Sequence, residues 1–200
     1  MVSPGAIVAE VAPPAKAVLQ ANDDAPFAEI TIHTGEKFAL GHMAQTVIKV
    51  PCSDIGREIV IGVTFTCHCY TEMYDAKKHK EEEIGLKDSG GRPRVFCKIR
   101  HELSARLPGI IGNLPGKRVY QTAQQRNYVY AVPLEIDGQI YEVYFMLQRH
   151  KGERFDLRLT VESAYAVQAA SPTRKRPRAI RFNVLAYKVM MNQPVKFAAR

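Results

Sequence analysis

Two segments decide the fold of this chain: QIYEVYFMLQ at residues 139–148 and DLRLTVESAYA at residues 156–166. Apolar and polar side chains alternate along much of both segments, which is the period-two pattern of strands with one buried face. The Lys151–Glu153 segment between them, Lys-Gly-Glu, predicts a turn. We therefore expect the two segments to pair as antiparallel strands.

One further strand is expected before this pair in the sequence, at residues 118–132, and one after it, at residues 179–190. Both segments are rich in the β-branched and aromatic residues that strands favour. Asp137–Gly138, just before residue 139, is a preferred two-residue hairpin turn. The four segments together predict an antiparallel four-stranded meander.

One principal helix is expected at residues 95–111, ahead of this meander. Apolar residues recur there at intervals of three and four, which is the helical period. They are Phe96, Ile99, Leu103, Leu107 and Ile110. Earlier segments at 28–33, 47–50 and 59–66 have strand patterns and predict a small leading β-hairpin sheet. The fold class that follows is α+β.

The chain is long enough for one domain, which we place at residues 27–200. Residues 1–26 are rich in alanine and proline and predict a flexible N-terminal tail. Within the domain we expect an exposed charged loop at residues 75–93 and a basic loop at residues 171–178.

Composition excludes several classes of protein. The sequence is 46% hydrophobic and 24% charged, which is unlike a collagen, a disordered chain or a disulfide scaffold. It has neither a long apolar run nor the features of a signal peptide at its start, so we expect no membrane span and a cytoplasmic location. We expect the four cysteines to be reduced, and we predict no cofactor.

The net charge of +8 is concentrated at the end of the chain. The last thirty residues contain basic side chains and no carboxylate, whereas basic and acidic residues balance in the remainder. The predicted nucleic-acid-binding residues are Arg174, Lys175, Arg176, Arg178 and Arg181. Such a cluster predicts salt-sensitive affinity for RNA or another polyanion, and the alternative is a solvated loop.

A candidate catalytic arrangement combines the expected helix with the strand at 156–166. Arg100 falls close to the apolar arc of the helix and therefore leans toward the sheet. Strict alternation places Arg158 and Glu162 on one face of the strand, and Ser163 on the apolar face. An Arg100–Glu162 pair follows from this arrangement, and the alternative to a catalytic role is an ion pair that fixes the helix against the sheet.

His68 lies in the string TCHCYTE at residues 66–72, at the end of an apolar strand. In a strand, Cys67 and Cys69 would point away from His68, which leaves the imidazole free to face a cleft and move a proton. A structural histidine is the alternative. A zinc site would need Cys52 or Cys97 as well, and because the spacing matches no paired-knuckle pattern we predict no metal.

Tyrosines are abundant in the expected sheet, where they either serve as ordinary strand residues or stack unpaired bases beside arginines. They are Tyr120, Tyr128, Tyr130, Tyr141, Tyr144, Tyr165 and Tyr187.

Three strings carry a resemblance to known proteins: HCYT at residues 68–71, the segment from Arg94 to Pro108, and VESAY at residues 161–165. Together they resemble a set of small uncharacterised proteobacterial and phage-associated proteins, over about residues 60–190. By fold analogy alone, a helix followed by a four-stranded meander is similar to the barnase, EndoU, colicin and RelE-like ribonucleases.

The second resemblance implies metal-free attack of a 2′-hydroxyl on the adjacent phosphate. It implies that His68 is the acid or base and that Arg100 and Arg158 clamp the phosphate. The leading hypothesis is therefore an RNA-directed protein, of the type of the metal-independent toxin ribonucleases. The alternative is a non-catalytic nucleic-acid-binding or protein-interaction module of the phage or plasmid accessory type.

Overall fold

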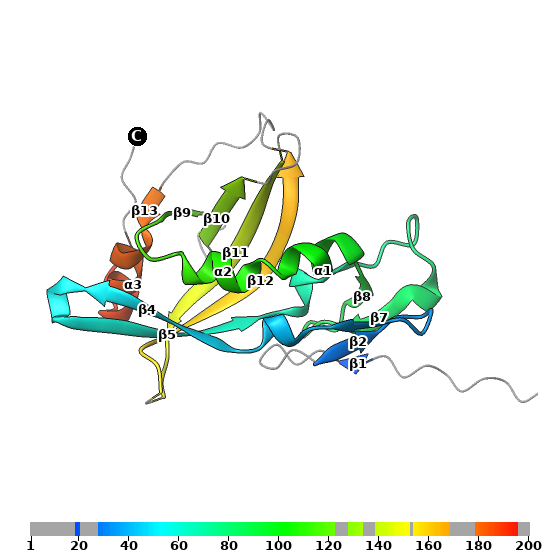
Figure 1. Cartoon of the computed structure of the whole chain (residues 1–200), viewed down its shortest axis with the longest axis horizontal. Helices are drawn as coiled ribbons and strands as arrows, with labels where there is room; N and C mark the ends of the chain where they lie inside the picture. Colours follow the sequence, from blue (N-terminus) through cyan, green and yellow to red (C-terminus); the bar gives the residue numbers. More distant parts are fainter. Residues whose placement is uncertain are drawn as a thin grey trace, which may run out of the picture.

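A seven-stranded mixed sheet forms the centre of the protein (Figure 1). The structure, a computed structural model, describes residues 19–20, 28–122, 128–133, 139–152, 154–168 and 179–195. The order of strands across the sheet is β13-β9-β10-β11-β12-β5-β4. Their bounds are β4 (Thr46–Cys52), β5 (Arg57–Phe65), β9 (Arg118–Gln121), β10 (Tyr128–Pro133), β11 (Gln139–Arg149), β12 (Leu157–Gln168) and β13 (Ala179–Arg181).

Strands β9 to β12 form an antiparallel meander, and β4 and β5 form an antiparallel hairpin. The two parts are joined by parallel pairing of β5 with β12, in which Val63 lies opposite Leu159. The α+β class predicted from the sequence is confirmed. The leading strands at residues 47–50 and 59–66, however, belong to the main sheet and do not form a separate small one.

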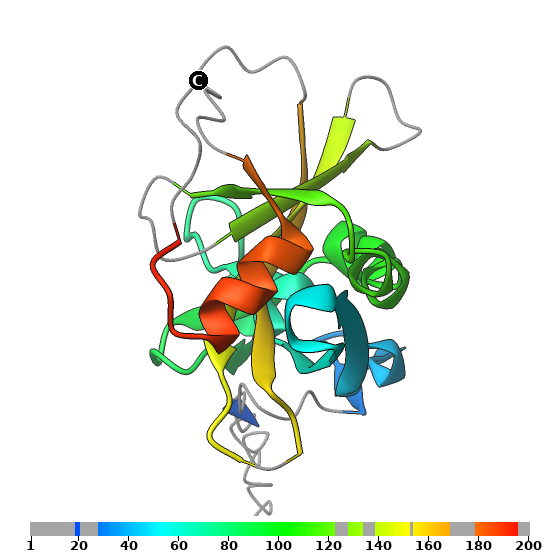
Figure 2. The ribbon, with the colours of Figure 1, turned by 90° about the vertical axis from the view of Figure 1, so that its left-hand side faces the viewer.

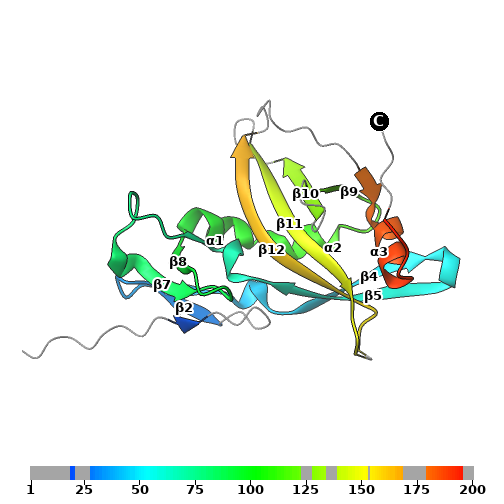
Figure 3. The same ribbon diagram turned by 180° about the vertical axis from the view of Figure 1, so that it is seen from behind.

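One face of this sheet is buried under helices α1 (Lys98–Ser104), α2 (Leu107–Gly112) and α3 (Phe182–Met190). Tyr141, Val143 and Phe145 point to this face and are completely buried, and the ring of Phe145 meets that of Phe182 edge-on. Figure 2 shows α3 running beside the β4 hairpin. Figure 3 shows β10, β11 and β12 in front of α1 and α2, so these helices leave the other face of the meander open.

A bulge in β12 changes which side chains lie on that open face. Tyr144 pairs with Ser163 but its neighbour Phe145 pairs with Val161, so Glu162 is the extra residue. Beyond it the alternation is reversed, and Ser163 lies on the open face. The expectation from strict alternation, that Ser163 lies on the apolar face, is therefore wrong.

A second sheet has the order β1-β7-β8-β6, and a short turn at residues 67–69 connects it to the end of β5. Its strands are β1 (Leu19–Gln20), β6 (Thr71–Met73), β7 (Ile84–Lys87) and β8 (Pro93–Phe96), and β2 (Glu29–Thr31) pairs with β3 (Lys37–Ala39) as a separate hairpin. Four short 3₁₀ helices complete the described structure: η1 (Gly41–Met43), η2 (Ser53–Ile55), η3 (Cys67–Cys69) and η4 (Glu81–Glu83).

Four sequence-based elements are corrected. The single helix expected at 95–111 is two short helices preceded by β8. Proline has no backbone N–H, and Pro108 lies in the first turn of α2, where an N–H would have no partner within the helix, so a new helix begins there. Residues 179–190 are a three-residue strand followed by α3, and residues 118–132 contain two strands, β9 and β10. The charged segment 75–93 is not only a loop, because it contains η4 and β7.

Several expectations concern residues outside the described part of the chain. Most of the N-terminal tail at 1–26 lies there, although Leu19–Gln20 form β1 against β7. The Asp137–Gly138 turn and the basic loop at 171–178, including Arg174, Lys175, Arg176 and Arg178, also lie outside the described residues.

Candidate functional site

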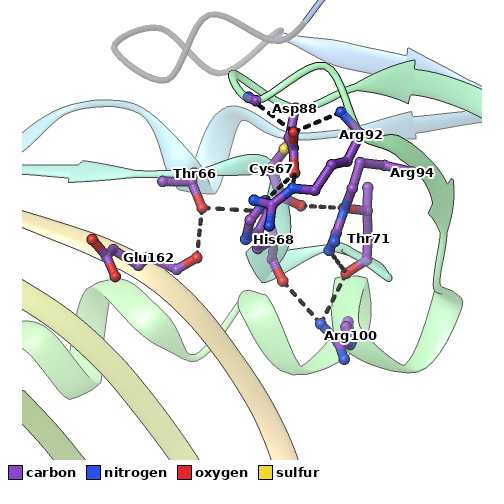
Figure 4. Close-up of polar contacts among 10 residues, drawn as sticks. Thr66, Cys67, His68, Thr71, Asp88, Arg92, Arg94, Arg100 and Glu162 are labelled. Atoms are coloured by element: carbon purple, nitrogen blue, oxygen red, sulfur yellow. Dashed lines mark hydrogen bonds and ion pairs between the residues drawn. The ribbon is translucent and has the colours of Figure 1, made fainter. Parts of the chain in front are cut away.

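His68 is held where the chain leaves the main sheet and enters η3 (Figure 4). The backbone N–H of Thr66 donates to Val161 in β12, and its hydroxyl donates to the Glu162 carbonyl at 2.7 Å. The same hydroxyl caps η3 by accepting the N–H of His68 at 3.3 Å. The end of β5 and the bulge of β12 therefore fix the position of His68 together. The expectation that this segment is a strand is wrong, because it is a capped 3₁₀ turn.

The imidazole of His68 meets a carboxylate from the second sheet. Nε2 of His68 lies 3.1 Å from Oδ2 of Asp88, whose side chain is completely buried. The Asp88 carboxylate also accepts the N–H groups of Gly90 and Arg92 and, at 2.9 Å, Nε–H of Arg92. These bonds close the turn between β7 and β8 around the carboxylate.

The protonation states of this pair follow from its surroundings. Burial lowers the pKa of His68 and the charge of Arg94 lowers it further, against the opposing contact with Asp88. Burial alone would raise the pKa of Asp88, but the hydrogen bonds it accepts and the charge of Arg92 lower it. Because a carboxylate can only accept, the neutral imidazole carries its proton on Nε2, which leaves Nδ1 as a base.

Two further arginines surround His68 and are held by backbone and hydroxyl oxygens. Arg94 is buried and donates to the Thr71 hydroxyl and carbonyl, each at 3.1 Å. Arg100 donates from Nη1 to the carbonyls of His68 and Thr71, at 3.3 and 2.9 Å. Positive charge is thus concentrated beside an oriented, neutral imidazole.

Arg100 also connects this cluster with the open face of the meander. Its guanidinium carbon lies 5.2 Å from the ring centroid of Tyr165, within the range of a cation–π contact. The Tyr165 ring stacks on Tyr144, with centroids 5.4 Å apart and an interplanar angle of 16°. The Tyr144 hydroxyl in turn donates to the buried carboxylate of Glu142.

The structure brings some of the predicted catalytic residues together and separates others. His68 and Arg100 are in direct contact. Glu162 reaches the site through its backbone carbonyl, and its carboxylate points away from both in Figure 4. Arg158 lies four residues earlier on β12, roughly 13 Å along the strand. Of the predicted nucleic-acid-binding residues, Arg181 is described and is exposed at the start of α3.

Sequence reasoning missed Asp88 and Arg94 as neighbours of His68. Asp88 belongs to the string DSGG at residues 88–91, a pattern in which an aspartate side chain commonly caps the turn that follows it. That signal could have indicated a fixed carboxylate, but not the histidine that it contacts twenty residues away.

The cysteines beside His68 are buried thiols. Cys67 and Cys69 point into the core, and burial raises the pKa of the Cys69 thiol. None of the four cysteines forms a disulfide. Within the described residues, no three histidine, cysteine or acidic side chains are grouped so that they could hold a metal ion.

The site therefore belongs to an α+β protein in which a histidine–aspartate pair and three arginines lie where two sheets meet. Residues 29–190 match the YjaZ family, and the chain belongs to that family. A curated relative is Protein YjaZ of Escherichia coli (strain K12), which is 26% identical over 132 residues, covering 66% of this chain and 70% of the relative. No solved structure matches the chain. None of the helices in the described part is long and apolar enough to cross a membrane.

Proposed function

We propose that the chain is an RNA-directed protein that binds single-stranded RNA on the open face of β11 and β12, beside His68. The observation that carries the proposal is the double contact of Arg100. Its guanidinium group holds the loop of His68 and lies against the ring of Tyr165. One side chain thus connects a stacked pair of aromatic rings with the positively charged cluster at the histidine.

The chemistry of this face suits an unpaired nucleotide chain. Tyrosine rings and arginine planes stack on bases of any sequence, and neighbouring cations neutralise phosphates. Arg158 lies on the same face as Tyr165 by the pairing of β12 with β11, and it is only partly buried. The excess charge at the end of the sequence adds a sequence-independent attraction for the same polyanion.

Binding is tested by fluorescence anisotropy with a labelled single-stranded RNA between about 50 and 200 mM salt, a range over which phosphate contacts weaken strongly. We expect Arg100→Ala to weaken binding and to reduce the slope of affinity against salt. Lys98→Ala is the matched control, because it removes the same charge from the exposed side of the same helix.

Stacking is tested separately with Tyr165→Leu, which removes the ring while keeping an apolar side chain. We expect it to weaken binding by about tenfold, as loss of one stacked base does. Tyr74→Leu, at a partly buried tyrosine outside this sheet, should bind like the unchanged protein. RNA binding that is equal in all four variants would contradict the proposal.

Metal-independent cleavage is a second candidate, and the His68–Asp88 pair is the observation that favours it. A neutral imidazole held by a buried carboxylate is the arrangement of a general base. Nδ1 would take the proton of a 2′-hydroxyl as its oxygen attacks phosphorus, and the bond to the 5′-oxygen breaks while that oxygen takes a proton from water. In this proposal Arg100 stabilises the phosphate beside His68, and Arg158, farther along β12, would bind another phosphate of the same RNA. Glu162 was also predicted to be catalytic, but its carboxylate points away from His68 and takes no part in this step.

Cleavage is tested by incubating labelled RNA with the protein in excess chelator and analysing the products for a 2′,3′-cyclic phosphate. His68→Ala should abolish the product, whereas His33→Ala, at an exposed histidine of the β2–β3 turn, should not. RNA binding without any such product would leave a non-catalytic binding module.

A further inference from the structure

A pocket of about 420 Å³ lies between α2 and the start of the meander, on the face that the helices cover. Its size is within the range of small-molecule sites. It is lined by Arg106, Gly109, Ile110, Asn113, Lys117 and Tyr130. None of these residues belongs to the His68 cluster or to the open face of the sheet.

The charge of this pocket is positive and uncompensated. Arg106 and Lys117 both line it, and neither forms an ion pair with a carboxylate of the described residues. The sequence between Glu102 and Glu135 contains no acidic residue at all. Two cations that converge on one concavity without a carboxylate define a site for an anion.

The pocket also has one polar group of fixed orientation and an apolar wall. The side-chain amide of Asn113 donates to the Gly109 carbonyl at 2.9 Å, which leaves its oxygen and second N–H for a ligand. Ile110 and the ring of Tyr130 supply the apolar surface. A ligand that fits must therefore combine an anionic group with a planar or apolar portion.

The edge of the pocket at Lys117 is held in place before any ligand binds. The N–H of Lys117 donates to the carbonyl of Leu114 at 2.9 Å. The carbonyl of Lys117 accepts the N–H of Phe182 at 2.8 Å. The preceding Gly116 has φ +80°, a conformation that favours glycine, and its N–H donates to the Asn183 side chain at 2.6 Å. Both contacts to α3 fix the lysine backbone, so on binding only the side chain of Lys117 has to be ordered.

We propose that this pocket binds a small phosphorylated molecule, with the phosphate on Arg106 and Lys117 and a planar group against Tyr130. Adenosine monophosphate is the probe, because it contains both parts. The site is independent of RNA binding on the opposite face, and either proposal can fail without the other.

The chain offers a matched pair of variants that test occupancy of the pocket. A Cβ added at Gly109 or at Gly112 meets nothing within 4 Å, so both accept a side chain without a clash, and both lie in α2. Only Gly109 lines the pocket. Gly109→Leu therefore adds a side chain to the lining of the pocket, whereas Gly112→Leu makes the same change to the helix outside it.

The experiment is isothermal titration of the full chain with adenosine monophosphate, adenosine and inorganic phosphate, with circular dichroism to show that the variants are folded. We expect the nucleotide to bind with a dissociation constant below about 1 mM and adenosine to bind at least about tenfold more weakly. Gly109→Leu and Lys117→Ala should each weaken nucleotide binding about tenfold or more, and Gly112→Leu should not change it. Absence of nucleotide binding, equal binding of adenosine, or binding that Gly109→Leu leaves unchanged would each overturn the proposal.

Discussion

Nε2 of His68 lies 3.1 Å from Oδ2 of Asp88, and the aspartate is the completely buried member of the pair. The carboxylate accepts hydrogen bonds from two backbone N–H groups and from Arg92 in addition to the histidine. It therefore fixes the orientation of the imidazole and at the same time closes the turn between β7 and β8.

Replacement of Asp88 by asparagine should destabilise the protein. An amide in this position presents N–H groups to donors that need an acceptor, so we expect a loss of about 2–3 kcal/mol in the free energy of unfolding. Urea unfolding followed by circular dichroism measures it. Asp54→Asn, at an exposed residue of η2, should change stability by less than about 0.5 kcal/mol. Equal effects of the two variants would show that the buried carboxylate is not a stabilising centre.

Stability should rise with pH on the acid side of neutrality. Burial lowers the pKa of His68 below its ordinary value of 6.5, so just below pH 6.5 the unfolded chain binds more protons than the folded one. The free energy of unfolding then increases with pH until the unfolded histidine is neutral. Asp88 adds to this at lower pH, because its lowered pKa gives stability that is lost as the carboxylate is protonated.

This pH dependence is measured by urea unfolding at intervals between pH 5 and 8. His68→Gln should reduce the slope of the free energy of unfolding against pH. Part of the slope should remain in this variant, because burial lowers the pKa of His42 as well. His33→Gln is the control, since that histidine is exposed. An unchanged slope in His68→Gln would contradict the assignment of a neutral, partly buried imidazole.

The stability of the protein should depend strongly on the hydroxyl of Thr71, which lies beside the arginines. Its hydroxyl donates to the Cys67 carbonyl at 2.7 Å and accepts Nε–H of the buried Arg94. Thr71→Val keeps the shape but leaves Nε–H of the buried Arg94 without this acceptor, while the Cys67 carbonyl keeps the N–H of Tyr70, so we expect a cost of about 2 kcal/mol. Thr71→Ser keeps the hydroxyl and should cost clearly less, and chemical denaturation compares the two. A serine variant as unstable as the valine variant would exclude the hydroxyl as the cause.

Gly62 should tolerate no side chain while Phe155 is present. A Cβ there would lie 2.6 Å from the phenylalanine ring, at the parallel junction of β5 and β12. We expect Gly62→Ala to cost about 1–3 kcal/mol. In the background of Phe155→Ala the same change should cost much less, and a double-mutant cycle by thermal or urea unfolding measures that coupling. Additive costs would mean that the ring moves aside freely.

The alternation of side chains predicted the strands of the meander, because a buried face repeats every two residues. It failed at Glu162, where the bulge reverses the faces, since no local signal distinguishes an inserted residue from the regular pattern. For α3 the helical signal was present: Phe182, Leu185 and Ala186 are buried at intervals of three and four. The short apolar segment also matched a strand, and periodicity alone does not separate the two.

In the candidate site, too, the sequence predicted some residues and missed others. The sequence predicted that Arg100 pairs with Glu162, but the Glu162 carboxylate points away and Arg100 donates instead to the backbone carbonyl of His68. Asp88 and Arg94 could not be assigned to His68, because they reach it only through a second sheet whose pairing depends on long-range hydrogen bonds.

By itself the sequence determined the α+β class, the strands of the meander and the concentration of positive charge near its end, because each depends on composition or on local periodicity. Only the tertiary structure decided that β5 joins β12 in parallel, that the helices cover one face of the meander, and that a buried carboxylate orients His68. These features depend on contacts between residues far apart along the chain, such as Val63 with Leu159, and their free energy exists only once the intervening segments have folded.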